Sequence, residues 1–381
     1  MAHKLAEMGH ETTVLEQKKT PGEHVCCTGI IGQECVAGFD IDEKVVFRQA
    51  NSAKLFSPSG KLLRLWRPEA QASTVDRAAF DLAMADRAQA KGARYMLDSR
   101  VQNIEVKENG VRVDVTHQEG RSSLEARAVV IATGFGSKLA ERLGLGKPGD
   151  FVIGAQAEVL ASVDEVEVYF GQEIAPGFFA WLVPTSPHKA LVGLLSRHNP
   201  GFYLAKFMSS LQARGEIDST GADTSYNGIP LKPLAKTYAD RLVVVGDAAG
   251  QVKPTTGGGI YYGLLCADIA AGVLHRALAS NNLTTRSLAA YEQEWKSKLS
   301  QELRIGYWAR KFYERLSDRQ IDRIFDIIRA HGIDEASLSF DWHSATLLRL
   351  LKGELMSEVV RMIKMPLHLG KGSRNQRGFV S

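Results

Sequence analysis

A carboxylate and a run of three glycines lie close together in residues 241–263, and their spacing suits one kind of chemistry. An apolar run typical of a β-strand leads to Asp247, and Pro254 and the glycines then precede an apolar segment typical of a helix. The Asp247 carboxylate can accept a hydrogen bond from a sugar-alcohol hydroxyl, while glycine N–H groups can approach a flat ring that any Cβ would push away. The positive end of the helix would stabilise negative charge on a reduced ring. The sequence therefore predicts a flavin site that includes Gly246, Asp247, Pro254, Gly257, Gly258 and Gly259.

This stretch resembles the second FAD motif of the para-hydroxybenzoate hydroxylase-like flavoproteins and, within them, of the geranylgeranyl reductase family. Residues 73–81 resemble the segment in which an arginine, here Arg77, reaches the cofactor and an amphipathic helix follows. Residues 128–134 resemble the strand and Ala-Thr-Gly turn of two-dinucleotide-binding flavoproteins, which implies that Thr133 and Gly134 also lie at the FAD. The resemblance runs through nearly the whole chain.

The resemblance includes an aromatic segment, residues 179–184, which is followed by Gly193. In the reductases the matching pattern is aromatic-x-Trp-x-Phe-Pro, followed by Gly-x-Gly. By resemblance, Trp181 helps to line an apolar tunnel for a prenyl chain, and the alternative is an ordinary core aromatic. Three positions depart from the pattern and bear on the substrate more than on the fold: Phe179, Val183 and Leu195.

An acidic residue near the start of the chain, Glu16, ends a strand-like segment that follows a helix-like turn closed by Gly9. In a dinucleotide-binding βαβ unit, the acid at this place binds the adenosine ribose and lies about 20 residues beyond a Gly-x-Gly-x-x-Gly loop. Only fifteen residues precede Glu16. The first strand and its glycine-rich loop are therefore expected before Met1. The alternative is a complete protein whose first helix begins at residue 1.

Two adjacent cysteines, Cys26 and Cys27, are the main candidates for a protein acid. In the resembling reductases, a loop that contains cysteine and glycine passes near the reactive face of the flavin ring. A thiol there can donate a proton or shape the pocket, although a buried cysteine can equally be a small apolar side chain. Tyr261, Tyr262 and His24 are alternative proton donors, but such residues more often serve packing or hydrogen bonding.

The resemblance implies that reduced FAD passes a hydride to an isolated carbon–carbon double bond of a prenyl (geranylgeranyl) lipid. A protein acid or water would supply the proton. A flavin monooxygenase or halogenase of the same fold is the alternative within the enzymes. A truncated, cofactor-free remnant that at most binds an apolar ligand or a partner protein is the alternative outside them. NAD(P)H, ferredoxin and quinols are all open as electron donors.

Composition and charge favour a globular catalyst. The 381 residues are 44% hydrophobic and 24% charged, enough for two lobes with cores, and the net charge of +4 gives no indication of nucleic-acid binding. The four cysteines lack Cys-x-x-Cys spacing, so neither a zinc site nor a disulfide framework is expected. Because the sequence shows no signal peptide and no apolar run as long as about 18 residues, it predicts a cytoplasmic protein.

These signals predict an α/β fold (α+β overall) with interleaved domains. In residues 344–369, leucines at helical spacing lie among basic groups. This favours either a helix packed on its own protein or, for a lipid-borne substrate, peripheral contact with a membrane. We expect residues 1–35, 70–150 and 235–285 to form a discontinuous Rossmann-like FAD-binding lobe, residues 36–69 and 151–234 an antiparallel-sheet substrate domain, and residues 286–381 a C-terminal helical region.

Overall fold

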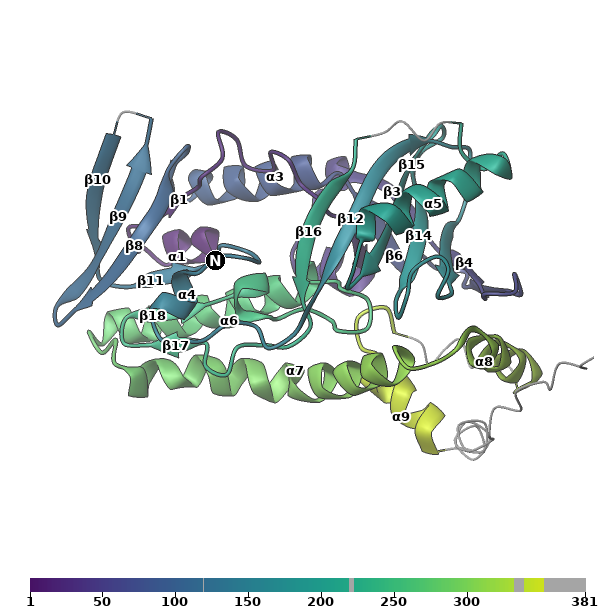
Figure 1. Cartoon of the computed structure of the whole chain (residues 1–381). Helices are drawn as coiled ribbons and strands as arrows, with labels where there is room; N and C mark the ends of the chain where they lie inside the picture. The colour runs from purple at the N-terminus through teal and green to yellow at the C-terminus, as the bar shows by residue number, and fades with distance from the viewer. Residues whose placement is uncertain (119, 219–222, 332–338, 353–381) are drawn as a thin grey trace, which may run out of the picture.

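The computed structural model describes residues 1–118, 120–218, 223–331 and 339–352, and in it the protein is elongated (Figure 1). Several short sheets form one lobe together with helices α1 (Ala2–Glu7), α3 (Arg77–Ala90) and α6 (Ile260–Ala279). A larger sheet forms the other lobe, and helix α7 (Thr285–Tyr313) runs beneath both. The mixed α/β class predicted from the sequence is confirmed.

The larger lobe is built on a seven-stranded sheet whose strands pair antiparallel, except for β13 with β4. Successive side chains of a strand face opposite sides. Ala180 and Leu182 therefore pack against α5 (Pro200–Ala213), whereas Phe179 and Trp181 face a cavity. In spatial order the strands are β16 (Ser225–Pro230), β12 (Phe151–Leu160), β15 (Lys189–Ser196), β14 (Phe179–Ser186), β13 (Val166–Phe170), β4 (Ser52–Phe56) and β5 (Leu62–Trp66).

The smaller lobe contains two short parallel strand pairs. β1 (Thr13–Leu15) pairs with β7 (Arg94–Met96), and β11 (Val129–Ile131) pairs with β18 (Leu242–Val244), which also pairs antiparallel with β17 (Tyr238–Ala239). Within the described residues β1 and β11 are edge strands, and residues of both line the same cavity. The parallel pairing is that of a Rossmann-like lobe, but the two pairs do not join into one sheet.

Two three-stranded antiparallel sheets belong to the same lobe. Residues 46–50 pair with β6 (Ala72–Val75) of this lobe, whereas β4 and β5 join the seven-stranded sheet. The chain therefore crosses between the lobes near Asn51. The two sheets are β10 (Gly120–Ala126), β9 (Gly110–His117) and β8 (Arg100–Lys107), and β2 (Ile30–Gly32), β6 (Ala72–Val75) and β3 (Val46–Ala50).

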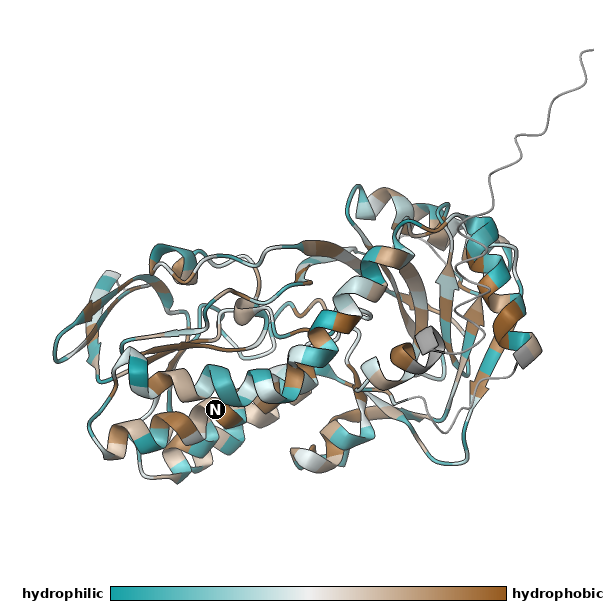
Figure 2. Cartoon of the chain, turned by 90° about the horizontal axis from the view of Figure 1, so that it is seen from below, coloured by the Kyte–Doolittle hydropathy of each residue, from teal (hydrophilic) through white to brown (hydrophobic). Residues whose placement is uncertain are grey.

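Helix α6 is the core helix of the smaller lobe. Cys266, Ala270 and Leu274 belong to one buried cluster with Trp295 and Leu299 of α7. Among the described residues it is the one helix that is long and apolar enough to cross a membrane, by length and composition only. Figure 2 shows hydrophobic and hydrophilic residues alternating along the helices that face the viewer, as expected for helices that cover a core on one side.

The C-terminal part of the described chain is helical, with α8 (Asp318–His331) and α9 (Ser344–Lys352) after α7. The leucine-rich helix expected in residues 344–369 begins in α9, and residues 353–369 lie outside the described part. Helices α7 and α9 contact each other. The segment that leads into α9, residues 339–343, contributes to the cavity.

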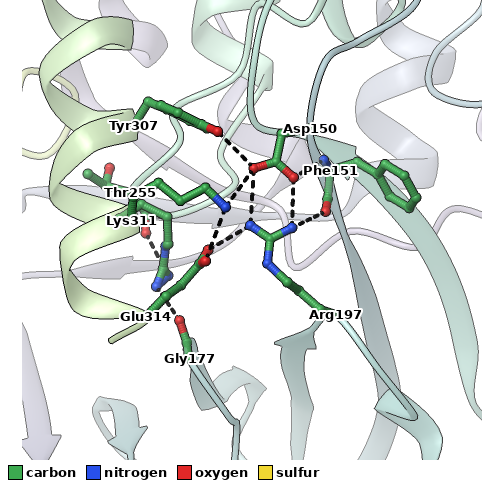
Figure 3. Close-up of polar contacts among 9 residues, drawn as sticks. Asp150, Phe151, Gly177, Arg197, Thr255, Tyr307, Lys311 and Glu314 are labelled. Atoms are coloured by element: carbon green, nitrogen blue, oxygen red, sulfur yellow. Dashed lines mark hydrogen bonds and ion pairs between the residues drawn. The ribbon is translucent and has the colours of Figure 1, made fainter. Parts of the chain in front are cut away.

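A charge cluster attaches α7 to the larger lobe (Figure 3). The Arg197 guanidinium donates to Asp150 at 2.7 and 3.1 Å and to Glu314 at 2.7 Å. Lys311 Nζ lies 3.0 Å from Asp150 Oδ2, and the Tyr307 hydroxyl donates to the same oxygen at 3.1 Å. Burial alone would raise the pKa of Asp150, but the hydrogen bonds from Arg197 and Lys311 outweigh burial and hold this pKa below its usual range.

Asp150→Asn is expected to lower the free energy of unfolding at pH 7 by roughly 1.5–3 kcal/mol, because it weakens charge-assisted hydrogen bonds. Since the folded-state pKa is depressed, the contribution of Asp150 is present above the usual aspartate pKa and is lost as the pH falls through the folded value. Urea unfolding should therefore show a smaller difference from wild type at about pH 3 than at pH 7. Asp164→Asn, at a side chain that is 97% exposed, is the control. A difference that is the same at both pH values would contradict this assignment.

Candidate functional site

A cavity of about 2350 Å³ is lined by residues of both lobes. Small-molecule sites usually measure roughly 300–1,000 Å³, so this cavity has room for more than one ligand. Pro254 is not part of its lining and instead packs against α7, where a Cβ at Gly306 would lie 3.4 Å from Pro254 Cδ. The other predicted site residues all line the cavity: Glu16, Cys26, Cys27, Arg77, Thr133, Gly134, Trp181, Gly246, Asp247, Gly257, Gly258, Gly259 and Tyr261.

The turn between β18 and α6 brings backbone up to the cavity wall. Gly246 and Gly257 have φ angles of +66° and +77°, which residues other than glycine rarely adopt. The loop is closed by hydrogen bonds from Gly257 N to Lys253 O at 2.8 Å and from Lys253 N to Gly258 O at 3.0 Å. A Cβ at Gly259 would lie 2.6 Å from Asp247 Oδ1, so the third glycine leaves room for the carboxylate at the start of α6.

The Asp247 carboxylate accepts no hydrogen bond from the described residues. Burial raises its pKa, and the positive charge of Arg77 opposes that rise. Arg77 donates to Asp81 at 2.7 Å, but its buried Nε has no partner within the described part of the chain. A polar acceptor and a polar donor thus lie at one cavity with unused hydrogen-bonding capacity, which fits a ligand that carries both hydroxyl groups and acceptors.

Two strand ends contribute the other polar groups predicted from the sequence. Glu16 follows β1, and its Oε1 accepts a hydrogen bond of 2.9 Å from the N–H of Lys18, which fixes the carboxylate at the cavity edge. Thr133 and Gly134 follow β11 and line the same cavity. Carboxyl ends of parallel strands are the usual place for a ligand in an open α/β sheet.

The cysteine loop connects the two lobes. Thr28 Oγ1 donates to Gln156 Oε1 of β12 at 2.8 Å, so the loop that carries the cysteines contacts the seven-stranded sheet. Burial raises the pKa of Cys26, which keeps its thiol protonated, whereas Cys27 lies beside the Arg77 guanidinium. All four cysteines are free.

Tyr261 is held by a partner of its own. Its hydroxyl donates to Glu34 Oε1 at 2.5 Å, and burial together with this carboxylate raises the pKa of Tyr261 far above its usual value. The other oxygen of Glu34 accepts from the Trp342 indole at 2.7 Å. Through Glu34, Tyr261 of α6 is therefore linked by hydrogen bonds to α2 (Gln33–Gly38) and to Trp342 of the C-terminal segment.

The opposite wall of the cavity is apolar and comes from the seven-stranded sheet. Trp181 lies directly over Gly193, where any Cβ would collide with the indole ring, and its buried Nε1 has no partner within the described residues. This wall reaches the glycine turn, because a Cβ at Gly257 would lie 3.3 Å from Ile229 Cδ1 and 3.4 Å from Leu195 Cδ1. Trp181 is thus a wall residue of the cavity, not only a core aromatic.

Lys253, Asp341 and His343 are among the polar cavity residues that sequence reasoning missed. Lys253 lies inside the glycine-rich motif, where its sequence position was a usable signal. Asp341 and His343 come from the segment before α9, and nothing local in the sequence marks that segment as part of the site. Within the described residues, no group of three or more His, Cys, Asp or Glu side chains is placed to hold a metal.

Comparison with known proteins places this geometry in context. A family model described as FAD dependent oxidoreductase matches residues 50–199. The digeranylgeranylglycerophospholipid reductase of Methanocaldococcus jannaschii is 32% identical over 343 residues, which cover 86% of this chain and 88% of the relative. A second such reductase, from Methanothermobacter thermautotrophicus, is 30% identical and covers 92% of each chain. The crystal structure of a geranylgeranyl bacteriochlorophyll reductase-like protein from Thermoplasma acidophilum matches with a TM-score of 0.86 at 23% identity, over 95% of this chain and 94% of that one.

FAD is the cofactor, and the residues of the cavity fit it. The unpartnered Asp247 carboxylate suits a ribityl hydroxyl donor, and Glu16 suits the hydroxyls of the adenosine ribose. Gly257, Gly258 and Gly259 line the cavity with backbone alone, which lets a flat ring approach closely. Arg77, Thr133, Gly134 and Gly246 line the same cavity.

Asp247→Asn is expected to separate cofactor affinity from stability. FAD affinity should fall about 10- to 100-fold, because a hydrogen bond to a charged acceptor becomes one to a neutral acceptor. In the FAD-free protein the raised pKa of Asp247 means that ionisation destabilises the fold, and this loss develops as the pH rises through the folded value. The FAD-free variant should therefore unfold at the same or a higher temperature than wild type at pH 7. FAD titration and thermal unfolding measure the two effects, and an unchanged FAD affinity would refute the assignment.

Proposed function

Because this chain belongs to the geranylgeranyl reductase family of FAD-dependent oxidoreductases, we propose that it reduces carbon–carbon double bonds of a geranylgeranyl or related prenyl lipid. When bound, reduced FAD supplies the hydride. A prenyl double bond carries no polar group, so it cannot be oriented by hydrogen bonds. The protein must therefore position the alkene by apolar contact, exclude water and hold a proton near the second carbon.

One observation supports this substrate class above all: the apolar wall meets the glycine turn. Leu195 and Ile229 lie within contact distance of the position that a Cβ would take at Gly257. Leu55, Val168 and Trp181 continue the apolar lining along the sheet. A hydrocarbon chain on this wall would therefore be held against the part of the cavity that receives the flavin ring, and proximity would contribute much of the rate.

The proton is proposed to come from Cys26. Its thiol lines the cavity and stays protonated at neutral pH because burial raises its pKa. Tyr261 is less suited, since its proton is already donated to Glu34. Cys27 instead lies beside the Arg77 guanidinium, and its sulfur accepts a hydrogen bond from the N–H of Gly29 at 3.4 Å.

We further propose a cytoplasmic protein that takes its substrate from a membrane surface. Trp66 is 49% exposed and lines the cavity, and the adjacent Arg67 also lines it. An aromatic ring beside a cation is typical of residues at a lipid–water interface. NAD(P)H, ferredoxin and quinols remain the proposed classes of electron donor.

The reaction class is tested without oxygen. FAD-loaded protein that has been reduced with dithionite should be reoxidised by a geranylgeranyl lipid under anaerobic conditions, and the product should gain two hydrogen atoms for each saturated bond. Flavin absorbance follows the reoxidation, and mass spectrometry identifies the product. A product that gains oxygen or halogen and forms only in air would assign the protein to the monooxygenases or halogenases. No reoxidation by any prenyl lipid would remove the substrate assignment and leave FAD binding intact.

Cys26→Ala is expected to slow this reoxidation by about 10²–10⁴-fold, the usual contribution of a general acid. Cys27→Ala is the matched control and should have a much smaller effect, because the neighbouring residue is not the proposed acid. Stopped-flow flavin absorbance measures both rates. Equal rates for Cys26→Ala and wild type would show that another group or water supplies the proton.

A further inference from the structure

A buried ion pair lies beside the glycine turn and has no part in the reaction described so far. Lys253 Nζ is 2.7 Å from Asp341 Oδ1, and the two side chains are only 7% and 3% exposed. Both residues line the cavity. Removing two charges from water costs free energy, which their mutual attraction offsets only when the geometry is good. This desolvated pair lies directly at the cofactor site.

The two charges of the pair lie at different distances from the glycine turn. Lys253 Nζ lies 3.6 Å from the position of a Cβ at Gly258, whereas the Asp341 carboxylate lies against Gly32, where a Cβ would collide with Oδ2. The ammonium group therefore faces the glycine turn, and the carboxylate lies farther from it. The positive end of α6 begins at the same turn and adds to the positive potential there.

Each member of the pair is held by contacts other than the pair itself. Lys253 is fixed by its two backbone hydrogen bonds within the glycine loop, and its Nζ also donates to Phe340 O at 3.3 Å. The backbone carbonyl of Asp341 accepts from the Tyr262 hydroxyl at 3.0 Å. Two residues further, His343 Nδ1 lies 2.6 Å from Thr255 Oγ1 of the same loop. Removal of one charge should therefore leave the other near its present place.

We propose that Lys253 and Asp341 set the reduction potential of the bound FAD, with opposite signs. Reduction adds negative charge to the flavin ring, so the ammonium group at the turn favours the reduced form and the carboxylate opposes it. Because the ammonium group lies nearer to the glycine turn than the carboxylate does, the effect of Lys253 should be the larger of the two. This inference rests on FAD binding and is independent of the lipid that is reduced.

The test uses full-length, FAD-loaded protein without any lipid substrate. Lys253→Met should shift the reduction equilibrium about tenfold toward oxidised FAD, the effect typical of one neighbouring charge, which is ~30 mV for a two-electron couple. Asp341→Asn should shift it in the opposite direction by a smaller factor, because the carboxylate lies farther from the glycine turn. Potentials are measured by equilibration with a reference dye. Sulfite affinity gives a second readout, because sulfite addition also leaves negative charge on the ring and should follow the same order.

The opposite signs distinguish charge tuning from a structural role. A structural role would weaken FAD binding in both variants and leave the potential of the retained FAD unchanged or shifted in one direction. Lys253→Arg keeps the charge and should stay near wild type. The control is Lys206→Met, at a surface lysine that is paired with Glu173.

If a single variant does not fold, Lys253→Met combined with Asp341→Leu replaces the pair by apolar groups, a change that buried ion pairs often tolerate. This double variant should lie below wild type in potential by less than Lys253→Met. Equal shifts of one sign, or no shift in any variant that retains FAD, would overturn the proposal.

Discussion

The site depends on one constraint: between β18 and α6 the chain must present backbone, and not side chains, to the cavity. Gly246 and Gly257 adopt positive φ angles, and Gly259 leaves the space that the Asp247 carboxylate occupies. Asp247 therefore lies half-buried near the start of α6 with no hydrogen-bond donor among the described residues, and Lys253 is placed in the same turn. The polar and apolar walls of the cavity meet at this turn, where a Cβ at Gly257 would approach Ile229 and Leu195 and a Cβ at Gly259 would collide with Asp247.

The parts of the site that follow from local sequence were predictable. The strand before Asp247, the glycine run and the helix after it lie where the motif indicated. Trp181, which the resemblance placed at the substrate, lines the cavity, so the alternative of an ordinary core aromatic does not describe it fully. Pro254 was grouped with the cofactor residues because of its place in the motif, yet it packs on α7, a helix about fifty residues further along the chain. Asp341 lay beyond local reasoning for the same cause, since its partner Lys253 is 88 residues away.

The position of the apolar wall relative to the glycine turn is set by α7. Arg310 of this helix donates to Gly177 O of the larger lobe at 3.0 Å and to Thr255 O of the glycine loop at 3.4 Å. Its guanidinium lies 4.1 Å from the centre of the Phe178 ring, a cation–π contact, and burial lowers its pKa to about 10, so it is still charged at neutral pH. Together with the Asp150 cluster, these contacts of Arg310 connect both the larger lobe and the glycine loop to one helix, α7.

Residues 339–343, which form part of the cavity wall, are synthesised late. Glu16 is near the beginning of the chain, and Asp341 is more than three hundred residues beyond it, yet both line the same space. During synthesis at about 5–20 residues per second, roughly 3–12 seconds separate the end of α6 from this segment. A cofactor that entered in that interval would meet a cavity still open to water at Lys253. The wall of the cavity beside Lys253 is therefore completed only after residues 339–343 have been made.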